Sequence, residues 1–182
     1  MKAYVGIDVA FAKKKYLPIS VCFHKYGRLC PILLKSKFAI TPDTNQFEVI
    51  KSKALTHLEN GGEQSRIPHA NQLWMLVGFE LFQTLCQKWE CIEVFPQAIV
   101  KTLGAGKIYK SKIEGLIKQL SAISGFTGWP EAISKSCLND IGFGSFHDKL
   151  DAYLSAWVAS LNMNEREPIG SPPNDVIWVP LI

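Results

Sequence analysis

The sequence predicts an α/β fold in which a mixed β-sheet is flanked by helices. β-branched and aromatic runs at residues 3–10, 16–24 and 28–37 predict an antiparallel N-terminal three-strand meander. A further apolar run at 91–96 predicts a later strand, and helical periodicity dominates the remainder. At 182 residues and 47% hydrophobic side chains, the chain has the size of one ordinary domain, so we expect a single domain over residues 1–182.

The elements between these strands follow from capping and breaking residues. Thr41 opens a helix with a capping-type side chain, and the helix continues until Asn60 and the two glycines after it. A second helix over residues 70–88 is apolar nearly all round, so we expect it to be well buried. A lysine-rich loop and helix follow at 101–120, and a short helix starts at Glu131.

The last third of the chain centres on one amphipathic helix. Residues 147–161 have a helical period, with an apolar stripe on one side. The tail at 168–174 is proline-rich, and residues 176–180 predict a last edge strand.

Composition limits the class of protein. A net charge of +4 permits a polyanionic partner without requiring one. The five cysteines contain no Cys-x-x-Cys pair, which indicates neither a disulfide framework nor a zinc site. The start of the chain is unlike a signal peptide and no apolar stretch is long enough to span a membrane, so we expect a cytoplasmic protein.

Four acidic side chains lie in segments that are otherwise apolar. Asp8 interrupts the first strand, Glu93 the later strand, and Asp148 and Asp151 the start of the last helix. A carboxylate in an apolar element is costly unless its charge is compensated. At about 100° per residue, Asp151 borders the apolar stripe and Asp148 lies roughly 60° beyond it, so both acids can point at one ligand.

These four acids predict a metal site if they meet in space. Converging negative charges need a cation, and oxygen-only ligands favour Mg²⁺ or Mn²⁺. Paired ions of this kind cut phosphodiesters, so the acids would be both metal ligands and catalytic residues of a hydrolase. The alternative is structural: Asp8 ends a strand or caps a turn, and Asp148 interacts with the helix dipole.

The order of these acids within their motifs resembles a known family. The chain is similar over most of its length to domain of unknown function family 429, regarded as predicted RNase H-like nucleases. The motifs that carry the resemblance are Gly6-Ile7-Asp8, Trp74-Met75 with Gly78-Phe79-Glu80-Leu81, Glu93-Val94-Phe95-Pro96, His147-Asp148 with Asp151-Ala152, and Trp178-Val179-Pro180. The resemblance implies an RNase H-like fold with Asp8, Glu93 and the Asp148 and Asp151 pair gathered at one sheet edge.

One part of the family pattern is missing from this chain. A strand carrying Ile-Asp-Ala-Pro belongs before the second helix, and residues 61–69 form a loop without aspartate there. Glu80, an acid in the buried second helix, is a possible extra acid in its place, and its alternative role is a structural ion pair.

Basic residues near these acids are candidates for binding a substrate. Lys13 and Lys14 follow Asp8, and Lys107 follows Glu93, so these lysines could hold phosphates of DNA or RNA. The alternative is that they are solvated surface lysines. His147 could shuttle a proton, or it could simply occupy a helix entry.

Two other classes of protein compete with a nuclease. A non-catalytic nucleic-acid-binding or protein-interaction module would keep the fold without the activity. A sugar-kinase-like phosphotransferase would need glycine-rich phosphate turns after the first acid, and Asp8 is followed by Val9 and Ala10. The oligomeric state has no signature in the sequence.

Overall fold

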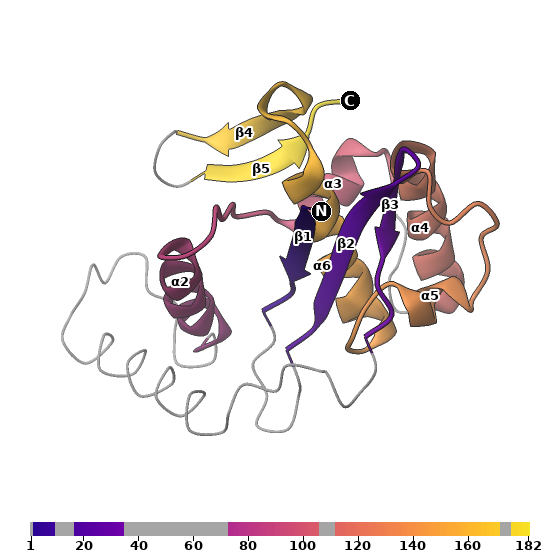
Figure 1. Ribbon diagram of the computed structural model, residues 1–182, viewed down its shortest axis with the longest axis horizontal. Helices are drawn as coiled ribbons and strands as arrows, with labels where there is room; N and C mark the ends of the chain where they lie inside the picture. Colours follow the sequence, from indigo (N-terminus) through magenta and orange to yellow (C-terminus); the bar gives the residue numbers. More distant parts are fainter. Residues whose placement is uncertain (1, 10–16, 35–72, 106–111, 172–175) are drawn as a thin grey trace. The chain divides into compact units, whose positions relative to one another are not determined.

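The computed structural model describes most of the chain, in two compact units (Figure 1). The first unit comprises Met1–Asp8, Pro18–Ala39 and Ile92–Ile182, and the second comprises Val9–Leu17 and Ile40–Cys91. One domain over residues 1–182 remains a prediction. The described residues are 2–9, 17–34, 73–105, 112–171 and 176–182.

The first unit contains the predicted antiparallel meander. Strands β1 (Ala3–Ile7), β2 (Ile19–Lys25) and β3 (Arg28–Pro31) form a sheet in the order β1-β2-β3. Tyr26 and Gly27 connect β2 to β3 with positive φ angles of 50° and 75°. A two-residue turn with both φ values positive matches the twist of the flanking strands, so this hairpin is tight. The α/β class and the meander are therefore confirmed.

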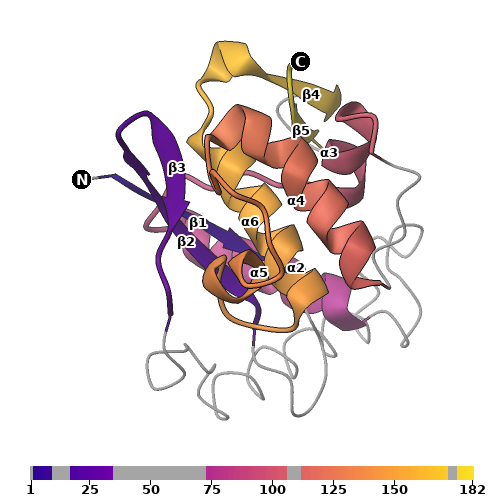
Figure 2. The same cartoon turned by 90° about the vertical axis from the view of Figure 1, so that its right-hand side faces the viewer.

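Helix α6 (Phe146–Ser160) is the centre of the first unit. It lies between the sheet and α4 (Ile113–Thr127), as Figure 2 shows, and also contacts α3 (Pro96–Thr102) and α5 (Cys137–Asp140). Every residue of α6 from Asp148 to Val158 is buried. A helix covered on all sides needs more than the single apolar stripe that its sequence shows, and small residues such as Ala152 provide the close packing.

Gly6 explains how closely α6 approaches β1. A Cβ atom at Gly6 would overlap the carbonyl oxygen of Ala152 and crowd the backbone nitrogen of Ala156. The strand and helix backbones therefore meet at this point, and no residue larger than glycine fits there without a shift.

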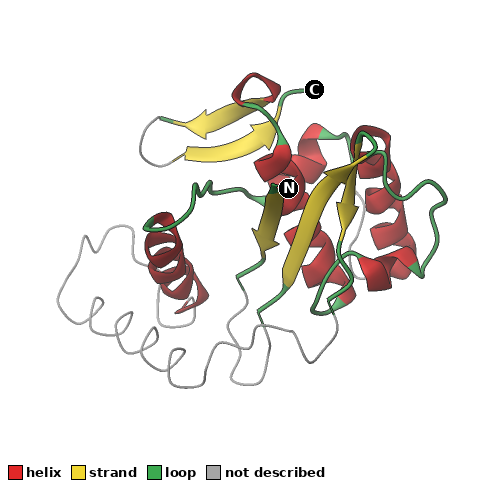
Figure 3. Cartoon of the chain, viewed as in Figure 1, coloured by secondary structure: helices red, strands yellow, loops and turns green. Residues whose placement is uncertain are grey.

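A second small sheet follows α6. Strands β4 (Arg166–Gly170) and β5 (Val176–Pro180) pair antiparallel after a short 3₁₀ helix, η3 (Met163–Glu165), as Figure 3 shows. The last edge strand was predicted, and β4 was not because Pro168 lies within it. Proline is tolerated here because β4 has one paired neighbour in the described structure and its other edge makes no ladder bonds.

Some expectations about burial and boundaries are wrong. The apolar run at residues 3–10 is typical of a strand covered on both faces, yet Val5 is 49% exposed because α6 covers the opposite face. Helix α2 (Leu73–Cys86), in the second unit, confirms the predicted helix, but Phe79 and Phe82 are exposed. Apolar composition alone does not specify which faces of a helix find partners. The short helix expected from Glu131 begins six residues later, as α5.

The helix predicted from Thr41 to Asn60 lies outside the described residues. Among the helices that are described, none combines the length and the hydropathy needed to cross a bilayer.

Candidate functional site at the amino end of helix α6

The first turn of α6 holds one of the predicted acids in a fixed position. Ser145, the N-cap, accepts a hydrogen bond from the backbone nitrogen of Asp148 at 3.5 Å. Its hydroxyl also donates to Asp148 Oδ2 at 2.6 Å. The Asp148 side chain is only 4% exposed, so this bond satisfies a nearly buried carboxylate oxygen.

Asp151, one turn later, faces the same point as Asp148. Its side chain is 11% exposed, and its Oδ2 lies 3.9 Å from Nε2 of His147. Nδ1 of the same imidazole lies 3.2 Å from Asp148 Oδ1. Because the His147 side chain is 54% exposed, the ring contacts both acids from the solvent side. The structure therefore brings Asp148 and Asp151 together, as the helical spacing predicted.

Asp8 lies at the same end of the sheet as the start of α6. Its backbone nitrogen donates to Pro18 O at 3.1 Å, which extends the register beyond the Ile7 and Ile19 pair. The next residue, Ile19, forms a bridge with Phe143 in the loop before α6. The two-residue period of a strand places Asp8 on the face of Gly6, which is the face covered by α6. Asp8 is half-buried there.

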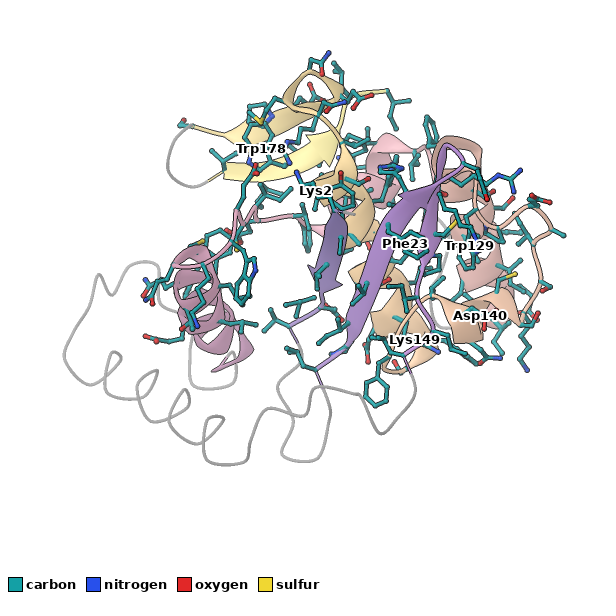
Figure 4. The ribbon with its side chains drawn as sticks, viewed as in Figure 1. Lys2, Phe23, Trp129, Asp140, Lys149 and Trp178 are labelled. Carbon is teal, nitrogen blue, oxygen red and sulfur yellow. The ribbon has the colours of Figure 1, made fainter. Side chains whose placement is uncertain are left out.

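Glu93 lies elsewhere in the first unit. Its carbonyl oxygen accepts from the backbone nitrogen of Trp178 in β5 at 2.9 Å, and the residue is exposed. Trp178 and Lys149, which follows Asp148, lie toward opposite ends of the first unit in Figure 4. The structure does not place Glu93 beside the acids of α6.

The strand expected around Glu93 is also absent from the described residues. Val94 makes an isolated parallel bridge to Trp178, and α3 begins at Pro96 immediately afterwards. Proline at the first helical position favours the helix over a longer strand, which leaves too few residues for a ladder.

A metal ion would find the right ligand chemistry but an incomplete set of ligands. Carboxylate oxygens suit Mg²⁺ or Mn²⁺. Within the described part of the chain, however, no three or more His, Cys, Asp or Glu residues form a group placed to hold a metal ion. The fold supplies the Asp148 and Asp151 pair, with Asp8 at the same end of the sheet, rather than a closed site.

A buried lysine next to the acid pair was missed from the sequence. Lys149 is 7% exposed, and its Nζ lies 5.0 Å from the centroid of the Phe146 ring. Burial lowers the pKa of Lys149, and the negative charge of Asp140 partly opposes this effect. Lys149 directly precedes Leu150, which belongs to the apolar stripe of this helix. This position next to the stripe was the signal in the sequence that Lys149 is buried. The Ser145 cap was detectable too, because serine three residues before an acid is a capping pattern.

The remaining predicted residues do not join this site. Lys13, Lys14 and Lys107 lie outside the described residues. Glu80 lies on α2 in the second unit, where it is half-buried.

Comparison with known proteins leaves the chain without an assigned relative. No protein-family profile, no curated protein and no solved structure matches it.

Proposed function

We propose that this protein is an RNase H-like, divalent-metal-dependent phosphodiesterase or nuclease, with its site at the amino end of α6. The observation that carries the proposal is the convergence of two nearly buried carboxylates, those of Asp148 and Asp151, on one imidazole. Two buried negative charges close together repel each other, and a bound cation relieves that repulsion. Asp8, at the adjoining end of β1, is the third acid of the proposed site.

The arrangement of the first unit supports the RNase H-like part of the proposal. An antiparallel meander is covered by a late helix, α6, that packs against β1 beside the first-strand acid. The resemblance in the motifs around Asp8 and Asp151 supports the same fold. A divalent ion would activate water for attack on phosphorus, and the chain's contribution would be to hold that ion with carboxylates.

The proposed partner is DNA or RNA, and the proposed compartment is the cytoplasm. The net charge of +4 is compatible with a polyanionic partner of this kind. All five cysteines are free thiols, as in proteins of reducing compartments.

The first test combines thermal unfolding with a cleavage assay. Saturating Mg²⁺ or Mn²⁺ should stabilise the protein, by about 2.7 kcal/mol at a hundred times the dissociation constant. The protein should also cleave single-stranded or duplex DNA or RNA when the ion is present. Asp151→Asn should remove the ion-dependent stabilisation and lower turnover at least ~100-fold, because even outer-shell residues of metal sites contribute 10- to 100-fold.

Two further variants complete this experiment. Glu114→Gln removes an exposed acid from the first turn of α4 and should change neither readout. Glu93→Gln decides whether Glu93, a predicted ligand that the structure places beside β5, belongs to the site. The proposal fails if neither ion stabilises the wild-type protein and no substrate is cut.

A non-catalytic nucleic-acid-binding or protein-interaction module is the second candidate. The observation that favours it is the incomplete ligand group among the described residues. For the nucleic-acid-binding form of such a module, we expect an affinity that falls linearly with salt concentration on a logarithmic scale. Binding would occur without turnover and would be unaffected by Asp8→Asn.

A further inference from the structure

A pocket of about 230 Å³ lies in the first unit, at the end of α6 far from the acid pair. Figure 2 shows three of the segments that border it: the turn between β2 and β3, the end of α4 and the end of α6. Since α6 has 15 residues, its two ends are roughly 22 Å apart at 1.5 Å per residue. The pocket is therefore separate from the proposed metal site.

One side of the pocket is aromatic. The rings of Phe126 and Trp157 lie 5.6 Å apart between centroids, with their planes tilted by 34°. Trp157 is 3% exposed and Phe126 is 53% exposed, so the buried indole supports a phenyl ring that is open to a ligand. The imidazole of His24, another lining residue, is held edge-on by Tyr4 at 5.5 Å. Aromatic faces of this kind attract cations.

The other side of the pocket presents a carboxylate that is already oriented. Oε2 of Glu165 accepts hydrogen bonds from the backbone nitrogen and from Nδ2 of Asn162, both at 2.7 Å. Oε1 takes no further hydrogen bond within the described structure. A ligand that donates to Oε1 would therefore meet a carboxylate whose position needs no reordering.

The charges around the pocket favour a cationic ligand. Among the described lining residues, Glu165 is the one with a full charge when His24 is neutral. Ser160 donates its proton to Trp157 O at 2.7 Å, which leaves its hydroxyl oxygen as an acceptor. Arg28, in β3 beside the pocket, forms an ion pair with Glu131. The lining therefore offers acceptors and ring faces to a group that brings positive charge and hydrogen-bond donors.

We propose that this pocket binds an organic cation, specifically a guanidinium group stacked on Phe126 and donating to Glu165. Guanidinium fits better than ammonium because it is planar, stacks on aromatic faces and donates in its own plane. The group can belong to an arginine side chain of a peptide or to a free small molecule. This inference does not depend on the proposed nuclease activity.

The test is a titration followed by NMR or calorimetry on the full chain. The probes are methylguanidinium, which is the head group alone, and Nα-acetyl-arginine methylamide, which presents that group on a peptide unit. Glu165→Gln should raise the dissociation constant about tenfold or more, as expected for a lost charged hydrogen bond. Glutamine keeps an oxygen acceptor for Asn162, so this variant should fold. Phe126→Ala should weaken binding about three- to tenfold.

Glu167→Gln is the matched control for the lost charge. Glu167 is an exposed acid on β4 outside the pocket lining, and its substitution should leave both affinities unchanged. Tighter binding of the arginine amide assigns the pocket to a peptide, whereas equal affinities assign it to a small molecule. Absence of binding by both probes overturns the proposal, and so does an equal loss in Glu165→Gln and Glu167→Gln. Preferential binding of guanosine, a neutral planar ligand, also overturns it.

Discussion

Two titratable side chains are buried where the sheet meets α6. Cys22 in β2 and Tyr153 in α6 are both fully buried, and the Tyr153 hydroxyl donates to Leu29 O at 3.1 Å. Burial raises the pKa of the Cys22 thiol from 9.0 to about 12, against the opposing effect of a hydrogen bond with Ser20. Burial also raises the pKa of Tyr153. Both groups are therefore held in their protonated, neutral forms.

These two groups predict a loss of stability at alkaline pH. The unfolded chain releases the Cys22 proton near pH 9.0, whereas the folded protein retains it to about pH 12. The free energy of unfolding should therefore fall as pH rises through this window, by up to about 1.4 kcal/mol per pH unit for each group. Urea unfolding under reducing conditions, between about pH 7 and pH 10.5, measures the slope.

Cys22→Ala should make this decline shallower, because it removes one of the two groups. Identical slopes for Cys22→Ala and the wild-type protein would contradict the assignment to Cys22.

At the scale of elements, the contact between β1 and α6 depends on one residue without a side chain. Gly6→Ala should destabilise the protein by about 3 kcal/mol, at the upper end for overpacking, because the added methyl group meets backbone atoms of Ala152 and Ala156. Gly125→Ala in α4 is the matched control, since a methyl group there meets nothing within 4 Å. This second change should stabilise the protein by about 0.5–1 kcal/mol. Chemical denaturation of both variants measures the difference, and equal effects would contradict the close approach.

Elements with a local pattern were predictable from the sequence. Alternating residues and the Tyr26-Gly27 turn specify the β2–β3 hairpin, and helical periodicity specifies α6. The same periodicity placed Asp148 and Asp151 on one side of α6 because residues three apart on a helix are neighbours.

Features that depend on tertiary packing were not predictable. Glu93 lies in an apolar run typical of a strand, but Pro96 starts a helix. The run pairs with β5 through the isolated bridge between Val94 and Trp178. Strand β4 was not predicted because it contains Pro168. The pairing of β4 depends on β5 rather than on the composition of β4 itself. The pocket at Glu165 is formed by residues of β2, β3, α4, α6 and η3 and of the segments between them, so no single segment of sequence shows it.

For the molecule as a whole, protection against hydrogen exchange should follow burial. The amides of α6 should exchange at least about tenfold more slowly than those of the second half of α2. All residues of α6 from Asp148 to Val158 are buried, whereas Phe79 and Phe82 of α2 are exposed. Exchange measured by mass spectrometry, corrected for intrinsic rates, provides the comparison. Equal protection of the two helices would contradict this ranking.

The contact of Gly6 with Ala152 also has a consequence for the order of events during synthesis. The strand that carries Gly6 leaves the ribosome early, whereas α6, which covers it, is made much later. Until then the α6-facing residues of the meander, such as Ser20 and Cys22, lack their covering layer. A fold built on such sequence-distant contacts forms slowly, so the nascent meander is the segment for which a chaperone would matter most.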